Sequence, residues 1–245
     1  MKGFIYIAFL VLIISSCDKN TAGDCFKSTG PVQTEERPIS GFHTILLKDN
    51  IDLELHSSNV NTLFIEAGEN LLSGINTSVV DSVLVIENNN RCNWVRSYDS
   101  PLKACLNFTR LDTIEYRSIG NISSTDTVFV DELVINVWEG AGDISFLVNT
   151  EMLFCNIHYG TADIKMSGVS QVSFIYSASF GLVDNRALIA RQVYLNNKSS
   201  NDVYVRAKER LEVTIENIGN VYYVGNPDEI TLNQVGSGEL IKLSN

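Results

Sequence analysis

Asp143 and Asp163 lie twenty residues apart, and a pair of carboxylates is the residue type that could carry out acid–base or nucleophilic catalysis. If the chain coils so that equivalent positions stack about 4.8 Å apart, their carboxylates approach the separation of about 5 to 5.5 Å used by retaining glycosidases. A turn role competes, because Asp and Asn hydrogen-bond their own backbone and tolerate left-handed conformations. Equivalent positions in the other repeats are Asn121, Leu182, Asp202, Asn220 and Glu239. A turn preference explains such a continuing series, whereas a catalytic pair does not require it, so the turn interpretation is favoured.

Metal chemistry has weaker support in the sequence. The segment Gly140-Ala141-Gly142-Asp143 faintly resembles glycine-rich calcium repeats, but those recur every nine residues and this pattern recurs near twenty. Two neighbouring carboxylates supply only part of the six to eight oxygens that calcium takes. The three histidines stand far apart without a zinc-ligand spacing. We therefore predict no bound metal and no cofactor.

The elements that must position these aspartates follow from a repeat. A buried-type aliphatic recurs seven times, with steps of 22, 20, 19, 20, 18 and 19 residues, and a polar residue directly precedes it six times and Leu182 once. The aliphatics are Ile122, Ile144, Ile164, Val183, Val203, Val221 and Leu240. A fixed period near twenty indicates one stacked structural unit per repeat. Short alternating apolar runs indicate strands rather than helices. The predicted fold is all-β, a right-handed β-helix or β-solenoid with coils of about 20 residues, forming a single domain over residues 40–245.

Alternation within each coil separates an inward from an outward set. Leu133, Ile135 and Val137 are predicted to point inward and to align with the residues twenty positions later, Leu153, Cys155 and Ile157. Trp138 and His158 fall on the opposite phase, one coil apart. Such an exposed ladder could stack on sugar faces or on a partner protein, whereas a local cover over the neighbouring coil is the competing interpretation. Together with Asp143 and Asp163 they form the candidate ligand surface.

The first seventeen residues resemble a bacterial lipoprotein signal. Lys2 precedes an apolar run from Phe4 to Ile14, too short to span a bilayer, and the run ends at Ile14-Ser15-Ser16-Cys17. We expect residues 1–17 to be a signal peptide with a lipidated Cys17, and residues 18–39 to be a tether. The expected location is the bacterial cell envelope, lipid-anchored and most consistent with the outer membrane, with the periplasmic or surface face left open.

Charge and cysteine placement narrow the partners. The net charge of −11 is spread without a basic cluster, which argues against a nucleic-acid partner. Cys25 and Cys92 lie outside the predicted strands in an oxidising compartment and are the best disulfide candidates, although Cys105 could replace either.

Three tripeptides of the form Asp-Ser/Thr-aliphatic suggest a modification. They resemble a pattern that certain Gram-negative bacteria O-glycosylate on exported proteins, and they place the candidate acceptors at Ser82, Thr113 and Thr127. Strand-entry turns favour the same residue types, so the alternative is that the tripeptides are only turns.

Turn and strand motifs carry a family resemblance over roughly residues 40 to 243. Residues 49–55 (DNIDLEL), 66–70 (EAGEN), 84–86 (LVI) and 235–240 (VGSGEL) are similar to the family described as putative auto-transporter adhesin, head GIN domain. One departure is that Ser118-Ile119-Gly120-Asn121 lacks the paired glycines expected at that turn. The resemblance implies a pectate-lyase-like β-helical shape and a role in adhesion, without recognised catalytic residues.

The function predicted from these observations is a non-enzymatic, lipid-anchored binding or adhesion module of the cell envelope. Its expected partners are a surface polysaccharide or an envelope or matrix protein, with the solenoid ends available for homo-oligomerisation. The alternative is a polysaccharide lyase or glycoside hydrolase on the same scaffold. A lyase that acts on anionic sugars needs clustered Arg or Lys, and the coils of Asp143 and Asp163 offer only Lys165 nearby. An assembly factor for outer-membrane complexes is a third possibility.

Overall fold

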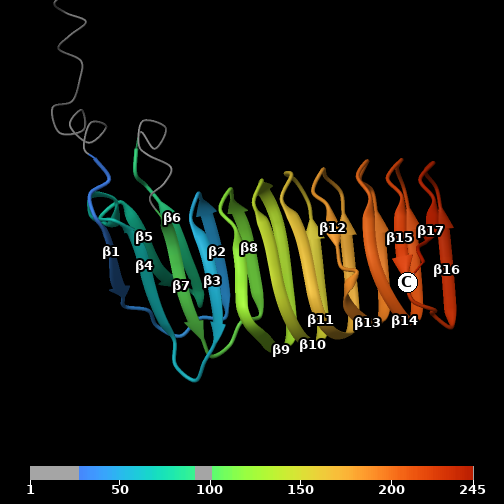
Figure 1. The fold of residues 1–245 in the computed structure, drawn as a ribbon, viewed down its shortest axis with the longest axis horizontal. Helices are drawn as coiled ribbons and strands as arrows, with labels where there is room; N and C mark the ends of the chain where they lie inside the picture. The colour runs from blue at the N-terminus through green and yellow to red at the C-terminus, as the bar shows by residue number, and fades with distance from the viewer. Residues whose placement is uncertain (1–27, 92–100, 245) are drawn as a thin grey trace, which may run out of the picture.

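The computed structural model describes residues 28–91 and 101–244, and almost all of them lie in strands. The chain is a β-solenoid of about six turns, which confirms the predicted fold class (Figure 1). Its long axis runs from β1 at one end to β16 and β17 at the other. The candidate ligand surface therefore consists of short strand segments stacked side by side along this axis.

The C-terminal coils are regular. Each coil has two legs joined by a bend, and both legs pair in parallel with the coils before and after. In the longer strands one element covers both legs, and elsewhere the legs are separate strands. The strands are β9 (Ile122–Gly140), β10 (Asp143–Ile157), β11 (Asp163–Ser177), β12 (Val183–Asp184), β13 (Ala187–Asn197), β14 (Val203–Ile215), β15 (Val221–Val224), β16 (Glu229–Gln234) and β17 (Leu240–Lys242).

The predicted register of these coils is confirmed. Asp143 pairs with Asp163 and Ile144 with Ile164. On the second leg Leu153 pairs with Leu133, and the alternation continues through the same strands. The reason is that every coil offers an aliphatic residue to the same interior position, so a slip by one residue would move the whole apolar set to the solvent.

The N-terminal part departs from a simple stack. Strands β2 (Thr44–Asp49) and β3 (Asp52–Ser57) are followed in the chain by a segment that lies outside them, and the chain then returns to place β8 (Thr113–Ser118) beside β2. On the outer side, β6 pairs in parallel with β2, and β7 pairs in parallel with β3. Strand β5 then pairs antiparallel with β6, and β4 pairs antiparallel with β7. The bounds of this outer segment are β4 (Thr62–Gly68), α2 (Glu69–Leu72), β5 (Ile75–Val80), β6 (Val83–Asn88) and β7 (Leu102–Phe108).

The expected tether over residues 18–39 requires a correction. Residues 18–27 lie outside the described residues, but β1 (Val32–Arg37) is a strand that pairs antiparallel with β4 along its whole length. The Arg37 guanidinium also donates to the carbonyl of Leu72 at 2.7 Å. The side chains of β1 are mostly exposed, so the strand joins the fold through backbone hydrogen bonds and carries no apolar alternation that a sequence pattern could reveal.

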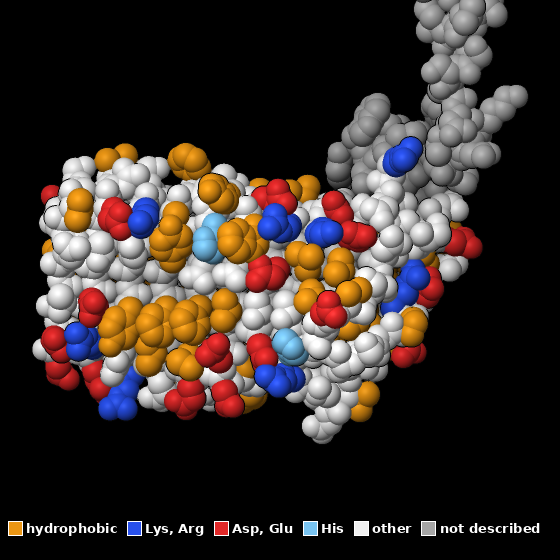
Figure 2. Space-filling model, turned by 180° about the vertical axis from the view of Figure 1, so that it is seen from behind, with side chains coloured by type: hydrophobic (Ala, Val, Ile, Leu, Met, Phe, Trp, Pro, Cys, Tyr) orange, Lys and Arg blue, Asp and Glu red, His pale blue; other side chains and the backbone are white. Residues whose placement is uncertain are grey.

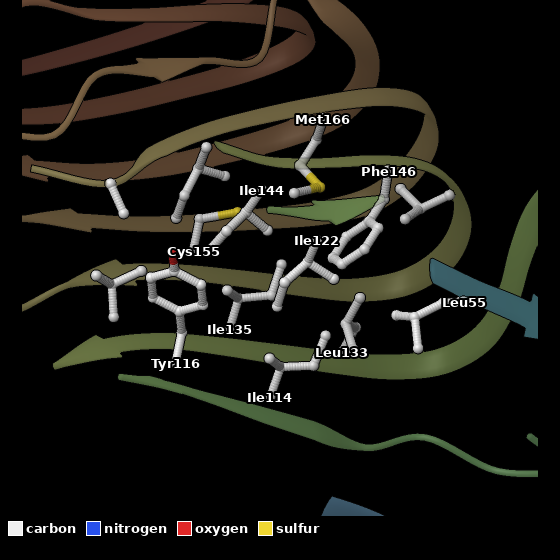
Figure 3. Close-up of a cluster of buried hydrophobic side chains, with 14 of the residues drawn as sticks. Leu55, Ile114, Tyr116, Ile122, Leu133, Ile135, Ile144, Phe146, Cys155 and Met166 are labelled. Carbon is white, nitrogen blue, oxygen red and sulfur yellow. The ribbon is translucent and has the colours of Figure 1, made fainter. Parts of the chain in front are cut away.

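The interior is one continuous apolar column. Ile114, Ile135, Cys155 and Ile175 succeed one another along the second legs, and each is buried. Figure 3 shows this region near the first regular coil, where the Tyr116 ring lies among aliphatic side chains. Close packing of this column, rather than any one contact, holds the coils in register.

Candidate functional site

Asp143 and Asp163 both take part in hydrogen bonds between successive coils, Asp143 through its backbone N–H and Asp163 through its carboxylate. The side-chain oxygen of Asn121 accepts the backbone N–H of Asp143 at 2.9 Å. In the same way the carboxylate of Asp163 accepts the N–H of Leu182 at 2.9 Å. The pattern recurs from Asp202 to Asn220 and from Asn220 to Glu239, each at 2.9 Å. The series is therefore a ladder of caps between successive turns, which supports the turn interpretation of these residues.

Asp143 departs from the ladder. The N–H of Asp163 goes to the carbonyl of Gly142 at 3.1 Å, and the Asp143 carboxylate instead lies 3.3 Å from the Lys165 ammonium. The same ammonium is 3.9 Å from the carboxylate of Asp163. One exposed lysine thus bridges both aspartates, an arrangement worth about 1 kcal/mol or less at a surface. Both carboxylates are used in contacts within the fold.

Trp138 and His158 lie side by side on the outside of β9 and just beyond β10. Their rings stack with centroids 4.1 Å apart and planes 7° apart. The indole N–H donates to Glu115, and the Arg117 guanidinium lies 5.7 Å from the indole ring. Partial burial lowers the pKa of His158 below its ordinary value, against the weaker opposing effect of Glu115. His158 is thus a neutral stacking partner at neutral pH.

Sequence reasoning missed a second aromatic row on the same leg of the coil. Phe154 and Phe174 stack with centroids 4.6 Å apart, and Phe174 and Tyr194 follow at 5.3 Å. The Arg210 guanidinium continues the row, 5.8 Å from the Tyr194 ring. The available signal was the spacing of these three residues, which repeats the twenty-residue period.

Between the two aromatic rows lies a column of three asparagines and one tyrosine, Asn136, Asn156, Tyr176 and Asn196, in which the Tyr176 ring lies 5.5 Å from that of His158. The Asn156 amide donates to the Asn136 carbonyl oxygen at 3.0 Å, and Asn136 donates to Glu115 at 2.9 Å. Further along, Asn196 donates to Glu216 at 3.0 Å, whereas its buried carbonyl oxygen has no hydrogen-bond partner among the described residues. A groove of about 340 Å³ runs here, lined in part by Phe154, Phe174, Tyr194 and Asn196.

We call this surface the aromatic face, and define it by both rows and the asparagines between them. Figure 2 shows the hydrophobic side chains on it as a continuous row along the long axis, with polar side chains alongside. Because the rings stack on one another, their faces are largely occupied and mainly their edges point outward. Trp138 is enclosed further, since Arg117 lies over one side of the indole and His158 stacks on it. The expected stacking of Trp138 and His158 on sugar faces thus has little free ring surface to use.

The predicted anchor and the predicted disulfide pair involve three cysteines. Cys17, Cys25 and Cys92 lie outside the described residues. The two cysteines within them, Cys105 and Cys155, are free thiols. Burial raises the pKa of Cys155 to about 12, which makes this thiol a small apolar core residue, as its inward position indicated.

The three candidate glycosylation residues occupy different settings. Ser82 lies in the tight turn between β5 and β6, where Asp81 and Ser82 both have positive φ, 49° and 64°. Thr113 is instead the first residue of β8, and Thr127 lies inside β9. The alternative of three strand-entry turns therefore fits Ser82 and Thr113 but not Thr127. Modification of all three stays a prediction.

Within residues 28–91 and 101–244 no cluster of three His, Cys, Asp or Glu side chains could hold a metal ion. In the same ranges no helix is both long and apolar enough to cross a membrane.

The fold is that of a β-solenoid. The model of the family described as putative auto-transporter adhesin, head GIN domain, matches residues 41–227. The chain belongs to this family, as its turn motifs indicated, and membership points to a protein of the cell envelope or surface. No curated protein matches the chain.

Solved structures confirm the fold. A putative adhesin from Bacteroides fragilis is 18% identical, with a TM-score of 0.78 over 87% of this chain and 97% of its own. A putative adhesin from Parabacteroides merdae is 18% identical, with a TM-score of 0.65 over 89% and 98%. A protein from Parabacteroides distasonis described as a putative lipid binding protein is 21% identical, with a TM-score of 0.67 over 89% and 98%. At these identities the likeness concerns the fold alone.

Proposed function

We propose that this protein is a lipid-anchored adhesion module of the cell envelope that binds a protein partner through the aromatic face and performs no catalysis. The observation that carries the proposal is the pair of aromatic rows, together with a groove along the row of Phe154, Phe174 and Tyr194. Tyr, Trp and Arg are the residue types that dominate binding energy at protein interfaces, and this face places them on a rigid scaffold.

The exposed edges of the rings favour a protein over a polysaccharide as the partner. The rings present mainly edges, which suit apolar side chains better than sugar faces. The Asn196 side chain lines the groove beside them, and its orientation is fixed because its amide donates to Glu216.

The binding test replaces aromatic side chains without introducing charge. In the double variant Phe154→Thr/Phe174→Thr we expect affinity for immobilised matrix proteins to fall by roughly 30-fold or more, because loss of two interface aromatics costs about 2 kcal/mol or more. The matched control is Val169→Thr/Ile189→Thr, which changes two exposed apolar residues that pair on the other leg. Circular dichroism checks that both variants stay folded.

Three outcomes of this test would contradict the proposal. Equal binding by the double variant and the control would remove the aromatic face as the site. Binding to an array of purified polysaccharides, with none to proteins, would make the partner a glycan. New reducing ends or unsaturated sugars released by the wild type, and lost in Asp143→Asn/Asp163→Asn, would show an enzyme.

The anchor is tested separately. We expect Cys17→Ala to move the full-length protein from the membrane to the soluble fraction, because the acyl chains on this cysteine would be its membrane attachment. Metabolic labelling with a fatty-acid analogue should mark the wild type and not the variant. A variant that remains in the membrane fraction, together with an unlabelled wild type, would show that Cys17 is not the anchor.

A further inference from the structure

The turns that join successive coils line one edge of the solenoid, and the bends between the two legs line the opposite edge (Figure 1). We call these the turn edge, over residues 119–238, and the bend edge. Five large apolar side chains on the turn edge are 63% to 70% exposed. Each belongs to a different turn, and they are Ile119, Tyr159, Phe180, Ile218 and Val235. The turn edge therefore presents a line of apolar side chains to the solvent.

The two edges differ in charge. The tips of the turns contain no charged residue, and they span residues 119–121, 140–142, 159–162, 178–181, 199–201, 217–219 and 235–238. The bend edge also exposes apolar side chains, such as Phe129, but charges accompany them. The charged residues at its bends are Asp131, Glu132, Glu151, Arg191, Lys208, Glu209, Arg210, Asp228 and Glu229. In a chain with a net charge of −11, an uncharged edge with exposed apolar side chains is suited to contact with surroundings of low polarity.

The N-terminal end of the described chain lies on the side of the turn edge. Strand β4 runs antiparallel to β7, which is parallel to β3, so α2 at the end of β4 lies on the same side as the turn between β2 and β3. The backbone N–H of Asn70 in α2 donates to the carbonyl of Thr29 at 3.1 Å. Cys17, the expected lipid-bearing residue, precedes Ser28 by eleven residues, which span at most about 40 Å when extended. Attachment through Cys17 would thus begin at the turn edge.

We propose that the turn edge rests on the surface of the lipid bilayer, with its apolar side chains in the interfacial region. This inference rests on the proposed anchor at Cys17, which brings the edge to the bilayer. Apolar side chains of interfacial segments enter about 5 to 10 Å into the boundary of headgroups and acyl chains, and tyrosine is enriched there. The anchor supplies the attachment, and the edge sets the orientation. The aromatic face, on the flank of the coils, then stands upright from the membrane and stays open to its partner.

A lipid surface fits the turn edge better than a protein does. Successive turns are stacked about 4.8 Å apart, so the six steps from Ile119 to Val235 cover about 29 Å in one line. A flat and extended surface meets all of these tips at once, whereas a protein interface surrounds a few clustered anchors with a polar rim. The tips also carry no charge that would lose hydration on entering the interface.

The test places a fluorescent reporter on each edge. Phe180→Cys on the turn edge and Ile189→Cys on the bend edge replace side chains that are 68% and 49% exposed, so neither change should disturb the core. The full-length lipidated variants are labelled with a thiol-reactive NBD dye and reconstituted into vesicles of phosphatidylethanolamine and phosphatidylglycerol that contain nitroxide-labelled lipid. We expect the nitroxide to quench the Phe180→Cys reporter several-fold more than the Ile189→Cys reporter. Wild type labelled in parallel gives the background from the native cysteines.

Charges on the neighbouring tips provide a second variant. Adding Tyr159→Asp and Ile218→Asp to Phe180→Cys should lower the quenching toward that of Ile189→Cys, because the carboxylates oppose entry into the interface, while circular dichroism shows an unchanged fold.

The outcomes separate this inference from the anchor on which it rests. Equal quenching of the two reporters, in vesicles with which the protein floats, would overturn the inference and leave the anchor intact. Protein that does not float with the vesicles would overturn both. A Phe180→Cys thiol that is unquenched in vesicles, yet shielded from a water-soluble maleimide in intact cells, would make the occupant of the turn edge a protein and overturn the inference.

Discussion

Ile144→Asp is expected to destabilise the solenoid by several kcal/mol. Ile144 is 0% exposed and stacks between Ile122 and Ile164 in the interior column, so the new carboxylate would be buried without a partner. Asp143→Ser, one residue earlier on the same strand, should cost about 1 kcal/mol or less, because it removes only an exposed ion pair with Lys165.

Thermal melts of the two neighbouring variants compare these effects directly. For a domain of this size about 2 to 4 °C of melting temperature correspond to each kcal/mol, so Ile144→Asp should melt at least about 10 °C lower, or fail to fold. Asp143→Ser should melt within a few degrees of wild type. Equal losses would mean that the inside and outside assignment of this strand is wrong.

Tyr116→Phe should cost about 2 to 6 kcal/mol, although it removes one oxygen atom. The buried hydroxyl donates to the carbonyl of Gly120 at 2.7 Å and accepts the N–H of Gly142 at 2.9 Å. Its removal leaves two backbone groups unpaired in the interior, each costing about 1 to 3 kcal/mol. Burial raises the pKa of Tyr116 to about 12, so the hydroxyl keeps its proton and this bridge at neutral pH.

The matched control is Tyr194→Phe on the aromatic face. That hydroxyl donates to the side chain of Gln192 at 3.1 Å in a half-buried setting, so its loss should change stability by about 1 kcal/mol or less. Denaturant titration of both variants measures the difference. A Tyr116→Phe variant as stable as Tyr194→Phe would show that the turn at Gly120 does not depend on the bridge.

This bridge also accounts for the departure at the first regular coil. The segment Ser118-Ile119-Gly120-Asn121 lacks the paired glycines expected there, and the sequence gives no replacement. In the structure the Tyr116 hydroxyl and the Ser118 hydroxyl, which accepts the N–H of Gly120 at 2.9 Å, stabilise the turn. Because the Tyr116 side chain reaches across the coil to Gly120 and Gly142, no short sequence pattern around the turn predicts this contact.

The candidate site was predicted only in part. The position of Trp138 beside His158 follows from the period, because residues one coil apart must be neighbours. The row of Phe154, Phe174 and Tyr194 obeys the same rule and was accessible in principle. The groove, the free oxygen of Asn196 and the covering of the ring faces depend on rotamers, which the period does not specify.

The sequence by itself determined the stacking of the C-terminal coils, because a repeated aliphatic position near every twentieth residue permits one register, in which Ile144 lies between Ile122 and Ile164. Only the tertiary structure decided the N-terminal order, in which β8 returns beside β2, and the membership of β1 in the fold. Those pairings use backbone hydrogen bonds between segments distant in the chain. Such bonds are available to any residue type, so they leave no signature in the residues that make them.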